Sequence, residues 1–391
     1  MKIALIGFGN AGSKVADEIF RYEQETGRSL SRYVVAINSA RSDLAKLDEI
    51  PTDKQILIGQ TDERVKGHGV GSDPELGAEV TRRDLQELER ALDGVPVYDI
   101  DAFLLVAGLG GGTGSGGAPV LADRISEMFD EPVYGLGVLP SKDEGGRASF
   151  NAARSLQSFV DATNNLLLFD NDAWRGHQDT VEAGYERMNK EIAARIGTLL
   201  AAGNIDESEV SENVMDASDV RRTLDTGGIS TVAYAETDLE SETRQSQGLL
   251  GRFRGNGTGQ ETDTAKKISG LVRQAVQSRL TCPATVSSAE RSLIVISGPP
   301  GEFSRKGLES ARRWVEQQTA SIEVLAGDDP RASANHVSAV VVLSNVTDVS
   351  RVDQLQEQAV DAADNIEDQA STREEDIERL IRDDEGRLDP L

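Results

Sequence analysis

The sequence predicts an α/β protein in which helices cover a parallel sheet. Two observations carry this prediction. Short apolar runs alternate with helical apolar patterns through the first half of the chain, which is the periodicity of successive βαβ units. Two of these runs pass directly into glycine-rich segments that open a helix, as strand-to-helix turns of such sheets do. The length of 391 residues makes two domains the natural expectation.

The first half contains predicted buried strands at residues 3–6, 33–37, 55–58, 102–106, 133–139 and 166–169. Helical patterns lie between them, at about 11–25, 75–92, 119–129 and 147–160. Strands that are apolar along their whole length are typical of parallel sheets. A long helical pattern over 179–203 follows, with apolar residues at three- and four-residue spacing. We therefore expect a first domain over 1–178 and a central helix that leaves it.

The second half has a different character and predicts a smaller α+β domain over 204–367. Strands are expected near 229–234, 292–297, 322–326 and 338–343, and helices near 264–279 and 305–318. Over 236–263 the apolar pattern gives way to Ser, Gln, Thr, Gly and Arg, which indicates a long loop. Over 368–391 sparse apolar positions among Arg, Asp and Glu indicate an acidic tail.

The chain is strongly acidic, with 67 acidic against 41 basic residues and a formal net charge of −26. The carboxylates are spread along the whole chain, and only about ten of the basic residues are lysine. Concentrated salt screens the resulting repulsion, so this composition indicates the cytoplasm of a halophile. The same charge argues against sequence-independent binding to nucleic acid or to anionic membranes, because both need clustered cations.

No transmembrane segment and no protein-held metal are expected. The apolar start of the chain is too short for a signal peptide, and no later run approaches the roughly 18 apolar residues of a membrane span. Cys282 is the one cysteine, which predicts a reducing compartment. The three histidines are far apart and lack ligand-like spacing. We expect a soluble, cytoplasmic protein.

The first glycine motif, Gly7–Gly12 (GFGNAG), fits the G-x-G-x-x-G fingerprint of dinucleotide-binding folds. A nicotinamide- or flavin-dependent oxidoreductase is therefore one candidate. That fingerprint also expects an acidic residue at the end of the second strand to hold the ribose, but Asn38 stands there and Asp43 lies too far along. A glycine loop at a helix N-terminus binds any phosphate through its exposed N–H groups.

The second glycine motif, Gly108–Gly117 (GLGGGTGSGG), is the more specific signal. It lies between a predicted strand and an apolar helix, so consecutive N–H groups can converge on phosphate oxygens without side-chain clash. No Lys-Ser/Thr pair ends it, so it is not a Walker loop. A flexible linker is the alternative, but linkers do not join a buried strand to an apolar helix.

This second motif resembles the GGGTGSG-type signature of the tubulin/FtsZ superfamily, and the resemblance extends in order over most of the chain. It implies the tubulin/FtsZ fold, which has a Rossmann-like GTPase domain, a long central helix and a smaller C-terminal α+β domain. It implies GTP or GDP as the bound nucleotide, with Mg²⁺ held through the phosphates and water.

The resemblance also implies nucleotide contacts at matching positions. The first phosphate loop would comprise Asn10, Ala11, Gly12, Ser13 and Lys14. The phosphates would be cradled by Gly110, Gly111, Gly112, Thr113, Gly114 and Ser115. Gly71 belongs to a segment, 67–75, that looks like the family's γ-phosphate-sensing loop, although a plain turn before a helix is the alternative.

At the other end of the nucleotide, Glu144 matches the residue that takes the ribose hydroxyls, a task that suits a carboxylate acceptor. Asn171 and Asn189 match the two residues that read the base, since an amide presents a donor and an acceptor together. A helix cap is the alternative for Asn171.

Residues 213–220 resemble the acidic loop with which one subunit completes the GTP site of the next. Asp216 and Asp219 would be the catalytic pair, and helix capping is the alternative. Val214 stands where FtsZ-like members carry Asn, so hydrolysis is expected to be slower or differently oriented. The resemblance implies a head-to-tail homopolymer, because a contact repeated by translation does not close.

Within the superfamily, segments 36–40, 65–71 and 168–174 look most like the CetZ group, which implies a cytoskeletal role in cell shape or motility. The chain end lacks the D-I-P-x-F-type peptide of division FtsZ proteins. A division-ring GTPase, a nucleotide-binding regulator without hydrolysis and, least favoured, an oxidoreductase are the alternatives. Loop 236–263 falls where tubulin makes lateral contacts, and a disordered insertion is the other interpretation.

Overall fold

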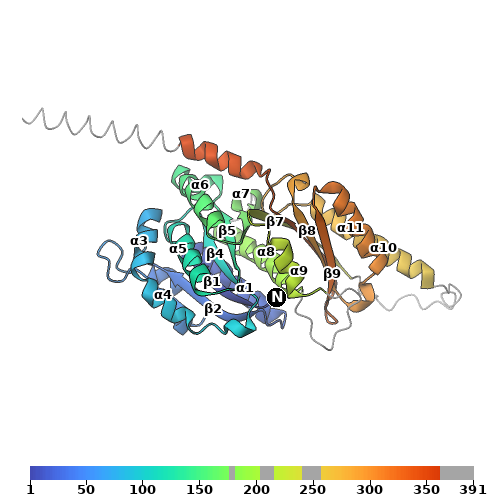
Figure 1. Cartoon of the computed structure of the whole chain (residues 1–391), viewed down its shortest axis with the longest axis horizontal. Helices are drawn as coiled ribbons and strands as arrows, with labels where there is room; N and C mark the ends of the chain where they lie inside the picture. The colour runs from blue at the N-terminus through green and yellow to red at the C-terminus, as the bar shows by residue number, and fades with distance from the viewer. Residues whose placement is uncertain (176–180, 203–214, 240–256, 362–391) are drawn as a thin grey trace, which may run out of the picture.

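The computed structural model describes residues 1–175, 181–202, 215–239 and 257–361 (Figure 1). Its strands form one ten-stranded sheet in the order β3-β2-β1-β4-β5-β6-β7-β10-β8-β9. The strands are β1 Ile3–Phe8, β2 Ser31–Asn38, β3 Gln55–Leu57, β4 Ala102–Gly108, β5 Val133–Leu139, β6 Asn165–Asp170, β7 Ile229–Asp238, β8 Arg291–Gly298, β9 Glu323–Pro330 and β10 His336–Ser344.

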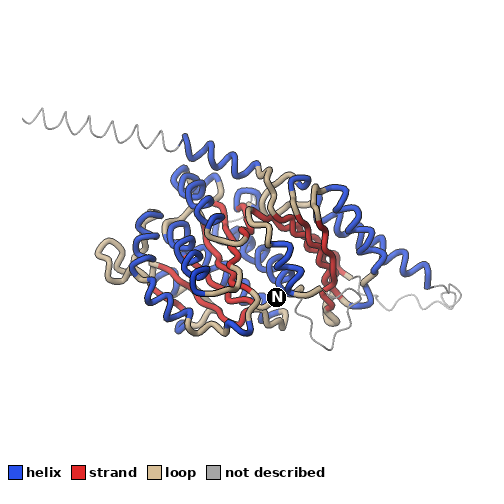
Figure 2. Tube along the Cα trace, in the orientation of Figure 1, coloured by secondary structure: helices blue, strands red, loops and turns tan. Residues whose placement is uncertain are grey.

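The helices lie on both faces of this sheet, as Figure 2 shows. They are α1 Gly9–Glu25, α2 Arg41–Leu44, α3 Pro74–Arg83, α4 Leu85–Leu92, α5 Thr113–Met128, α6 Gly146–Asp161, α7 Asn171–Trp174, α8 Val181–Ala201, α9 Ala217–Leu224, α10 Gly257–Gln277 and α11 Arg305–Gln318. Residues 350–361 form one more helix. Among the described residues, none of these helices is both long and apolar enough to cross a membrane.

Strand β1 lies at the centre of the parallel half of the sheet, between β2 and β4. All six of its residues are buried, and they alternate between two cores. Ile3 and Leu5 pack with α1 and α8, whereas Ala4, Ile6 and Phe8 pack with α3, α5 and α6 on the opposite face. Burial on both faces explains why the strand is apolar throughout. The predicted α/β class with a parallel sheet is confirmed.

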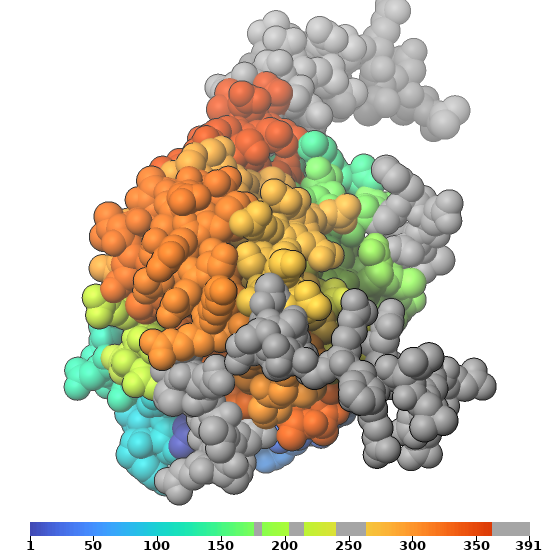
Figure 3. All heavy atoms as spheres, turned by 90° about the vertical axis from the view of Figure 1, so that its right-hand side faces the viewer, coloured from blue at the N-terminus to red at the C-terminus, as the bar shows by residue number. Residues whose placement is uncertain are grey.

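The sheet continues from the first half of the chain into the second. β7 pairs with β6 in parallel through Leu166–Ile229 and Leu167–Ser230, and it then pairs with β10 in the antiparallel direction. The periodicity predicted the strands of the second half but not this edge-to-edge join. α8 packs against α1 and also reaches β7, β8 and β10. On the other face α10 and α11 cover these strands, and Figure 3 views the molecule from their end.

Several predicted boundaries are wrong. The helix predicted over 75–92 is two helices that meet at Asp84, which has φ −96° and ψ 10°. The Asp84 carboxylate accepts the Gly59 N–H at 2.6 Å, so a local partner outside the helix holds this residue in the break. α5 begins at Thr113, inside the glycine run and well before Pro119, because glycine's weak helix propensity hides this first turn.

Other differences concern the second half. β7 extends to Asp238 and α10 already begins at Gly257, so the ends of the loop predicted over 236–263 are regular structure. The helix at 350–361 is absent from the predicted elements. Asn213, Val214, the middle of the predicted loop and the tail predicted over 368–391 lie outside the described residues.

Candidate nucleotide site

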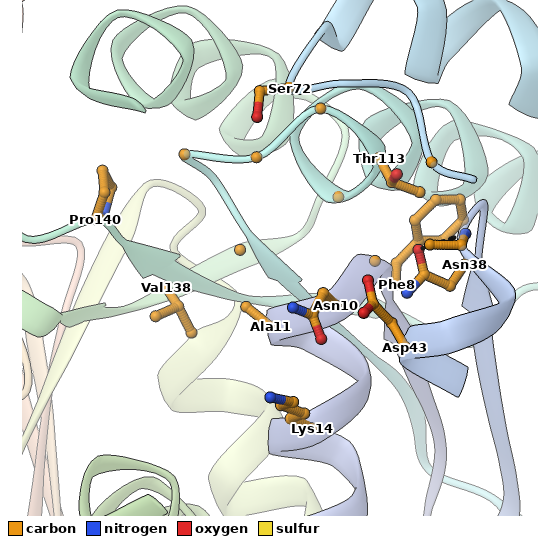
Figure 4. Close-up of a pocket in the computed structure, with 18 of the residues that line it drawn as sticks. Phe8, Asn10, Ala11, Lys14, Asn38, Asp43, Ser72, Thr113, Val138 and Pro140 are labelled. Atoms are coloured by element: carbon orange, nitrogen blue, oxygen red, sulfur yellow. Dashed lines mark hydrogen bonds between the residues drawn. The ribbon is translucent and has the colours of Figure 1, made fainter. Parts of the chain in front are cut away.

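A pocket of about 520 Å³ opens at the carboxyl ends of the parallel strands (Figure 4). Ligands bind at this edge in open α/β sheets, because the strand-to-helix turns converge there. The predicted site residues that line the pocket are Asn10, Ala11, Lys14, Gly71, Gly110, Gly111, Gly112, Thr113, Gly114, Glu144, Asn171 and Asn189. The fold therefore brings together residues that are up to 179 positions apart in the sequence.

Three predicted residues lie behind the lining of the pocket. A Cβ on Gly12 would lie 2.1 Å from the Val106 oxygen, so α1 can approach β4 this closely only with glycine there. Ser13 is buried, and its hydroxyl donates to a carbonyl of the first glycine loop at 3.4 Å. Ser115 Oγ donates to the Gly112 oxygen at 3.3 Å. These residues shape the two loops from within.

Two helices point their N-termini at the pocket. α1 begins at Gly9 and α5 at Thr113, and neither has a capping side chain or an acidic residue in its first turn. Their first N–H groups are therefore open to an anion. Gly9 has φ +74°, which turns β1 into α1, and a Cβ there would lie 2.8 Å from Gly114 N. This one glycine thus lets both loops meet at the same anion site.

The glycines in and around the second loop are required for different physical reasons. Gly111 lines the pocket, and a Cβ built on it would meet no atom within 4 Å, so its missing side chain leaves room for a ligand. A Cβ on Gly116 would instead lie 1.9 Å from the Pro74 oxygen, and one on Gly77 would lie 2.3 Å from the Gly112 oxygen. Gly77 and Gly116 therefore serve the close packing of α3 against α5.

Matched alanine substitutions distinguish a glycine that leaves room for the ligand from one that allows close helix packing. Gly111→Ala is expected to weaken nucleotide binding and leave the unfolding temperature unchanged, because the methyl group meets only the ligand. Gly116→Ala is expected to lower the free energy of unfolding by about 1–3 kcal/mol, because α3 must move. Titration with a fluorescent guanosine nucleotide and thermal unfolding measure the two effects. The reverse pattern would show that the roles have been assigned the wrong way round.

Asn38, at the end of β2, has an unpaired donor in the pocket. The residue is 1% exposed, and its Oδ1 accepts the Ser39 N–H at 2.8 Å, which fixes the amide. Its Nδ2 is buried and has no hydrogen-bond partner among the described residues. Such a donor is costly unless an acceptor arrives, and a phosphate oxygen fits this need. A carboxylate, which a dinucleotide fold requires here, would repel the phosphate.

The other end of the pocket gathers polar groups from three elements. Glu144 ends the short 3₁₀ helix η3 (Lys142–Glu144), Asn171 begins α7, and Asn189 lies on α8. Tyr185, one turn before Asn189, also lines the pocket. Burial and the neighbouring Glu144 carboxylate raise the pKa of Tyr185 to about 12, so the phenol remains a donor at neutral pH. The helical pattern marks Tyr185 only as apolar, although its spacing places it on the face of Asn189.

Two further residues are not among the predicted site residues, and Asp43 was considered only as a ribose ligand and set aside. Asp43 lines the pocket because the one-turn helix α2 returns the chain to it, and Figure 4 shows its carboxylate on the same side as Asn10. Asn151, on α6, donates through Nδ2 to the Ser72 oxygen at 3.0 Å and to the Gly110 oxygen at 3.2 Å. It therefore ties the loop before α3 to the loop before α5. Neither belongs to a sequence motif.

Asp216 and Asp219 lie away from this pocket, at the start of α9. Asp216 Oδ1 accepts the Ser218 N–H at 2.8 Å, and Asp219 Oδ2 accepts the Asp216 N–H at 3.1 Å, which forms a capping box. The hydrogen bonds from Ser218 lower the pKa of Asp216. Asp216 and Asp219 thus cap the helix, which the sequence offered as the alternative to a catalytic role. Asp216 is exposed, so its carboxylate can also meet a second molecule.

An anion cradle at the carboxyl edge of a parallel sheet, a long helix behind it and a mixed sheet beyond β6 together define a protein of the tubulin/FtsZ superfamily. Residues 2–179 match the model of the Tubulin/FtsZ family GTPase domain, and residues 178–361 match that of the C-terminal domain of tubulin-like CetZ. The chain belongs to the CetZ family of tubulin-like proteins.

Relatives and solved structures agree with this membership. The tubulin-like protein CetZ1 of Haloferax volcanii, a halophilic archaeon, is 50% identical over 94% of both chains, and CetZ3 of the same organism is 47% identical over 100% of both. The GDP-bound CetZ1 monomer superposes with a TM-score of 0.82 at 46% identity, over 93% of this chain and 100% of that one. The GTPγS-bound CetZ2 protofilament gives 0.81 at 39% identity, over 94% and 100%.

Proposed function

We propose that this protein binds and hydrolyses GTP in the pocket described above and assembles head to tail into filaments that control cell shape or motility. The anion cradle carries the proposal, since two uncapped helix N-termini, the open space at Gly111 and the unpaired Asn38 amide all suit a phosphate chain. The names of the structural relatives, one GDP-bound and one a GTPγS-bound protofilament, support both nucleotide and assembly.

In this proposal the pocket divides the nucleotide into three parts. The N–H groups at the starts of α1 and α5 take the phosphates, with the Lys14 ammonium beside them. Glu144 and Tyr185 face the ribose as acceptor and donor. Asn171 and Asn189 read the guanine edge. The GTP-binding domain then corresponds to 1–178, α8 to the central helix, and 204–367 to the assembly domain.

Mg²⁺ fits the phosphate end of the pocket. Asp43 and Asn10 offer oxygen ligands there, which this hard cation prefers, either directly or through water. When bound, the ion neutralises charge that develops on the phosphates. The protein residues then need only to position the nucleotide and the attacking water.

We further propose that Asp216 and Asp219 of a neighbouring copy complete the site. Phosphoryl transfer depends mainly on positioning and charge, and a carboxylate that accepts a hydrogen bond from the water orients it towards the γ-phosphate. Neither acid lines the pocket of its own chain, and Asp216 is exposed, so in this proposal the acids reach the pocket of a neighbouring copy. The stretch before Asp216, including Val214, lies outside the described residues.

The rate of GTP hydrolysis is expected to rise more than linearly with protein concentration. A site shared by two copies forms only on contact, so dilute protein binds GTP but turns it over slowly. Phosphate release, measured in molar KCl with Mg²⁺ from nanomolar to micromolar protein, should show a threshold that coincides with light scattering. A constant specific activity over this range would place the whole catalytic site within one chain.

The capping box favours one second candidate, a nucleotide-binding regulator that does not hydrolyse GTP. In that case Asp216 and Asp219 would only hold α9. Asp219→Asn distinguishes the two, because the amide oxygen can still accept the Asp216 N–H while the charge is lost. Lateral contacts through 236–263, proposed from the resemblance, concern residues that lie mostly outside the described chain.

A further inference from the structure

The helix at 350–361 begins beside the base end of the pocket, next to α7 (Figure 1). Its second residue, Arg351, is 2% exposed. Arg351 Nε donates to Asp170 Oδ1 at 3.0 Å, and Nη2 donates to the Pro140 carbonyl oxygen at 2.8 Å. One guanidinium from near the end of the described chain thus joins two segments of the first half.

Both partners of Arg351 adjoin residues that line the pocket. Pro140 lines it and leads into η3, which ends at Glu144. Asp170 ends β6, and its side chain caps α7 by accepting the Asp172 N–H at 3.1 Å. Asn171 follows directly. The guanidinium therefore fixes the spacing between the segment that carries the ribose acceptor and the segment that carries the base reader.

Three other contacts join η3 to α7 or to the residue that follows it, and all are more exposed. The Lys142 N–H donates to Asp172 Oδ1 at 3.1 Å. Lys142 Nζ lies 3.2 Å from Asp172 Oδ2, with side chains 51% and 26% exposed. Arg175 pairs with Asp143. Exposed pairs contribute little, and concentrated salt screens them further. The side chains of Arg351 and Asp170 are each 3% exposed, so salt barely affects this pair.

A purely structural tie is the alternative, and the energetics argue against it. Desolvation largely offsets the attraction within a buried ion pair, so an apolar pair would stabilise the fold equally well. Arg351 Nη1 is buried and has no partner among the described residues, which adds a cost. Burial also raises the pKa of Asp170 against the opposing effect of Arg351. A planar guanidinium adds what an apolar pair lacks, because two of its nitrogens, held in a rigid fork, donate to a carboxylate and to a carbonyl at a fixed spacing.

We infer that Arg351 is a positioning residue of the nucleotide site, which holds Glu144 and Asn171 at the spacing that ribose and guanine require. The helix at 350–361 thereby sets the affinity for the nucleoside part of the ligand and leaves the phosphate part unaffected. This inference rests on the proposed binding of GTP.

The test uses the full chain in molar KCl and the double variant Arg351→Met/Asp170→Asn. Replacing both partners avoids an uncompensated buried charge, and Asn can still cap α7. Arg28→Met/Asp329→Asn is the matched control, because this pair is also nearly buried, at 11% each, but neither residue lines the pocket. Arg351→Lys keeps the charge but replaces the rigid fork of two nitrogens with a single ammonium on a flexible stem, which holds the two partners at a less fixed spacing.

Displacement of a fluorescent guanosine nucleotide is measured with two competitors, GDP and inorganic tripolyphosphate. The Arg351→Met/Asp170→Asn variant should bind GDP about 10-fold more weakly than the wild type and bind tripolyphosphate as the wild type does. The GDP affinity of Arg351→Lys should lie between those of the wild type and the double variant. The Arg28→Met/Asp329→Asn control should bind both competitors normally.

Unchanged GDP affinity, or an equal loss for both competitors, would overturn the positioning role. If the wild type bound neither the fluorescent guanosine nucleotide nor GDP, the proposed function itself would fail, and the inference with it. That outcome is recognisable in the wild type alone, before any variant is compared.

Discussion

Two variants that are each inactive are expected to hydrolyse GTP when they are mixed. Asp219→Asn keeps an intact pocket but lacks the acid, and Gly111→Asp keeps the acid but places a carboxylate where the phosphates bind. Each alone should lose about 100-fold in turnover or more. In a mixed filament some contacts join an intact pocket to an intact acid, and random mixing makes about a quarter of them complete.

The structure explains why each of these two substitutions should remove one function and leave the fold intact. A Cβ on Gly111 meets no protein atom within 4 Å, so the new side chain occupies the ligand's space and leaves the packing intact. Asp219 Oδ2 accepts the Asp216 N–H, and an asparagine oxygen can replace it in the cap. Phosphate release at constant total protein measures the outcome.

A double variant that carries both substitutions is the control for this mixing experiment. Mixed with Asp219→Asn, it supplies no intact acid, so activity should stay at the level of the single variants. Recovery in that control, or none in the first mixture despite filaments that contain both proteins, would remove Asp219 from the shared site.

Removing salt is expected to unfold the protein. The formal net charge of −26 makes the compact state repel itself, and lowering salt from 1 M to 0.1 M lengthens the screening distance from about 3 Å to about 10 Å. Surface ion pairs gain from the same change, but such pairs contribute only about 0–1 kcal/mol each. Repulsion among the surplus carboxylates therefore dominates, and circular dichroism should show loss of structure in dilute buffer.

Sucrose distinguishes screening from a general solvent effect. It is excluded from protein surfaces and favours burial, but it does not screen charge. At 0.1 M salt it should therefore restore less structure than NaCl, which should act like KCl. A fully folded protein in dilute buffer would contradict the expected role of the charge.

The parts of the fold that sequence predicts best are those that depend on neighbouring residues. β1 and β4 are apolar throughout because both faces are buried, and each runs into a glycine loop that opens a helix. Both signals are local, and the phosphate end of the site follows from them. The break at Asp84 is different, since it depends on the distant N–H of Gly59.

The contacts that the sequence does not reveal are made between elements far apart in the chain. Asn151 binds two loops from α6, and Asp43 reaches the pocket only because of a four-residue helix. Arg351 meets Asp170 across 181 positions. No spacing rule predicts such contacts, because they follow from how separate elements pack against one another in the folded chain.

The division of labour among the loop glycines has an evolutionary consequence. In a descendant that had lost the ability to bind nucleotide, nothing in the fold would oppose a side chain at Gly111, whereas Gly77 and Gly116 would still be held by the contact of α3 with α5. Such a family member, which no longer binds nucleotide, would keep most of the glycine-rich signature sequence. The residue at position 111, more than the number of glycines, should therefore distinguish family members that bind nucleotide from those that do not.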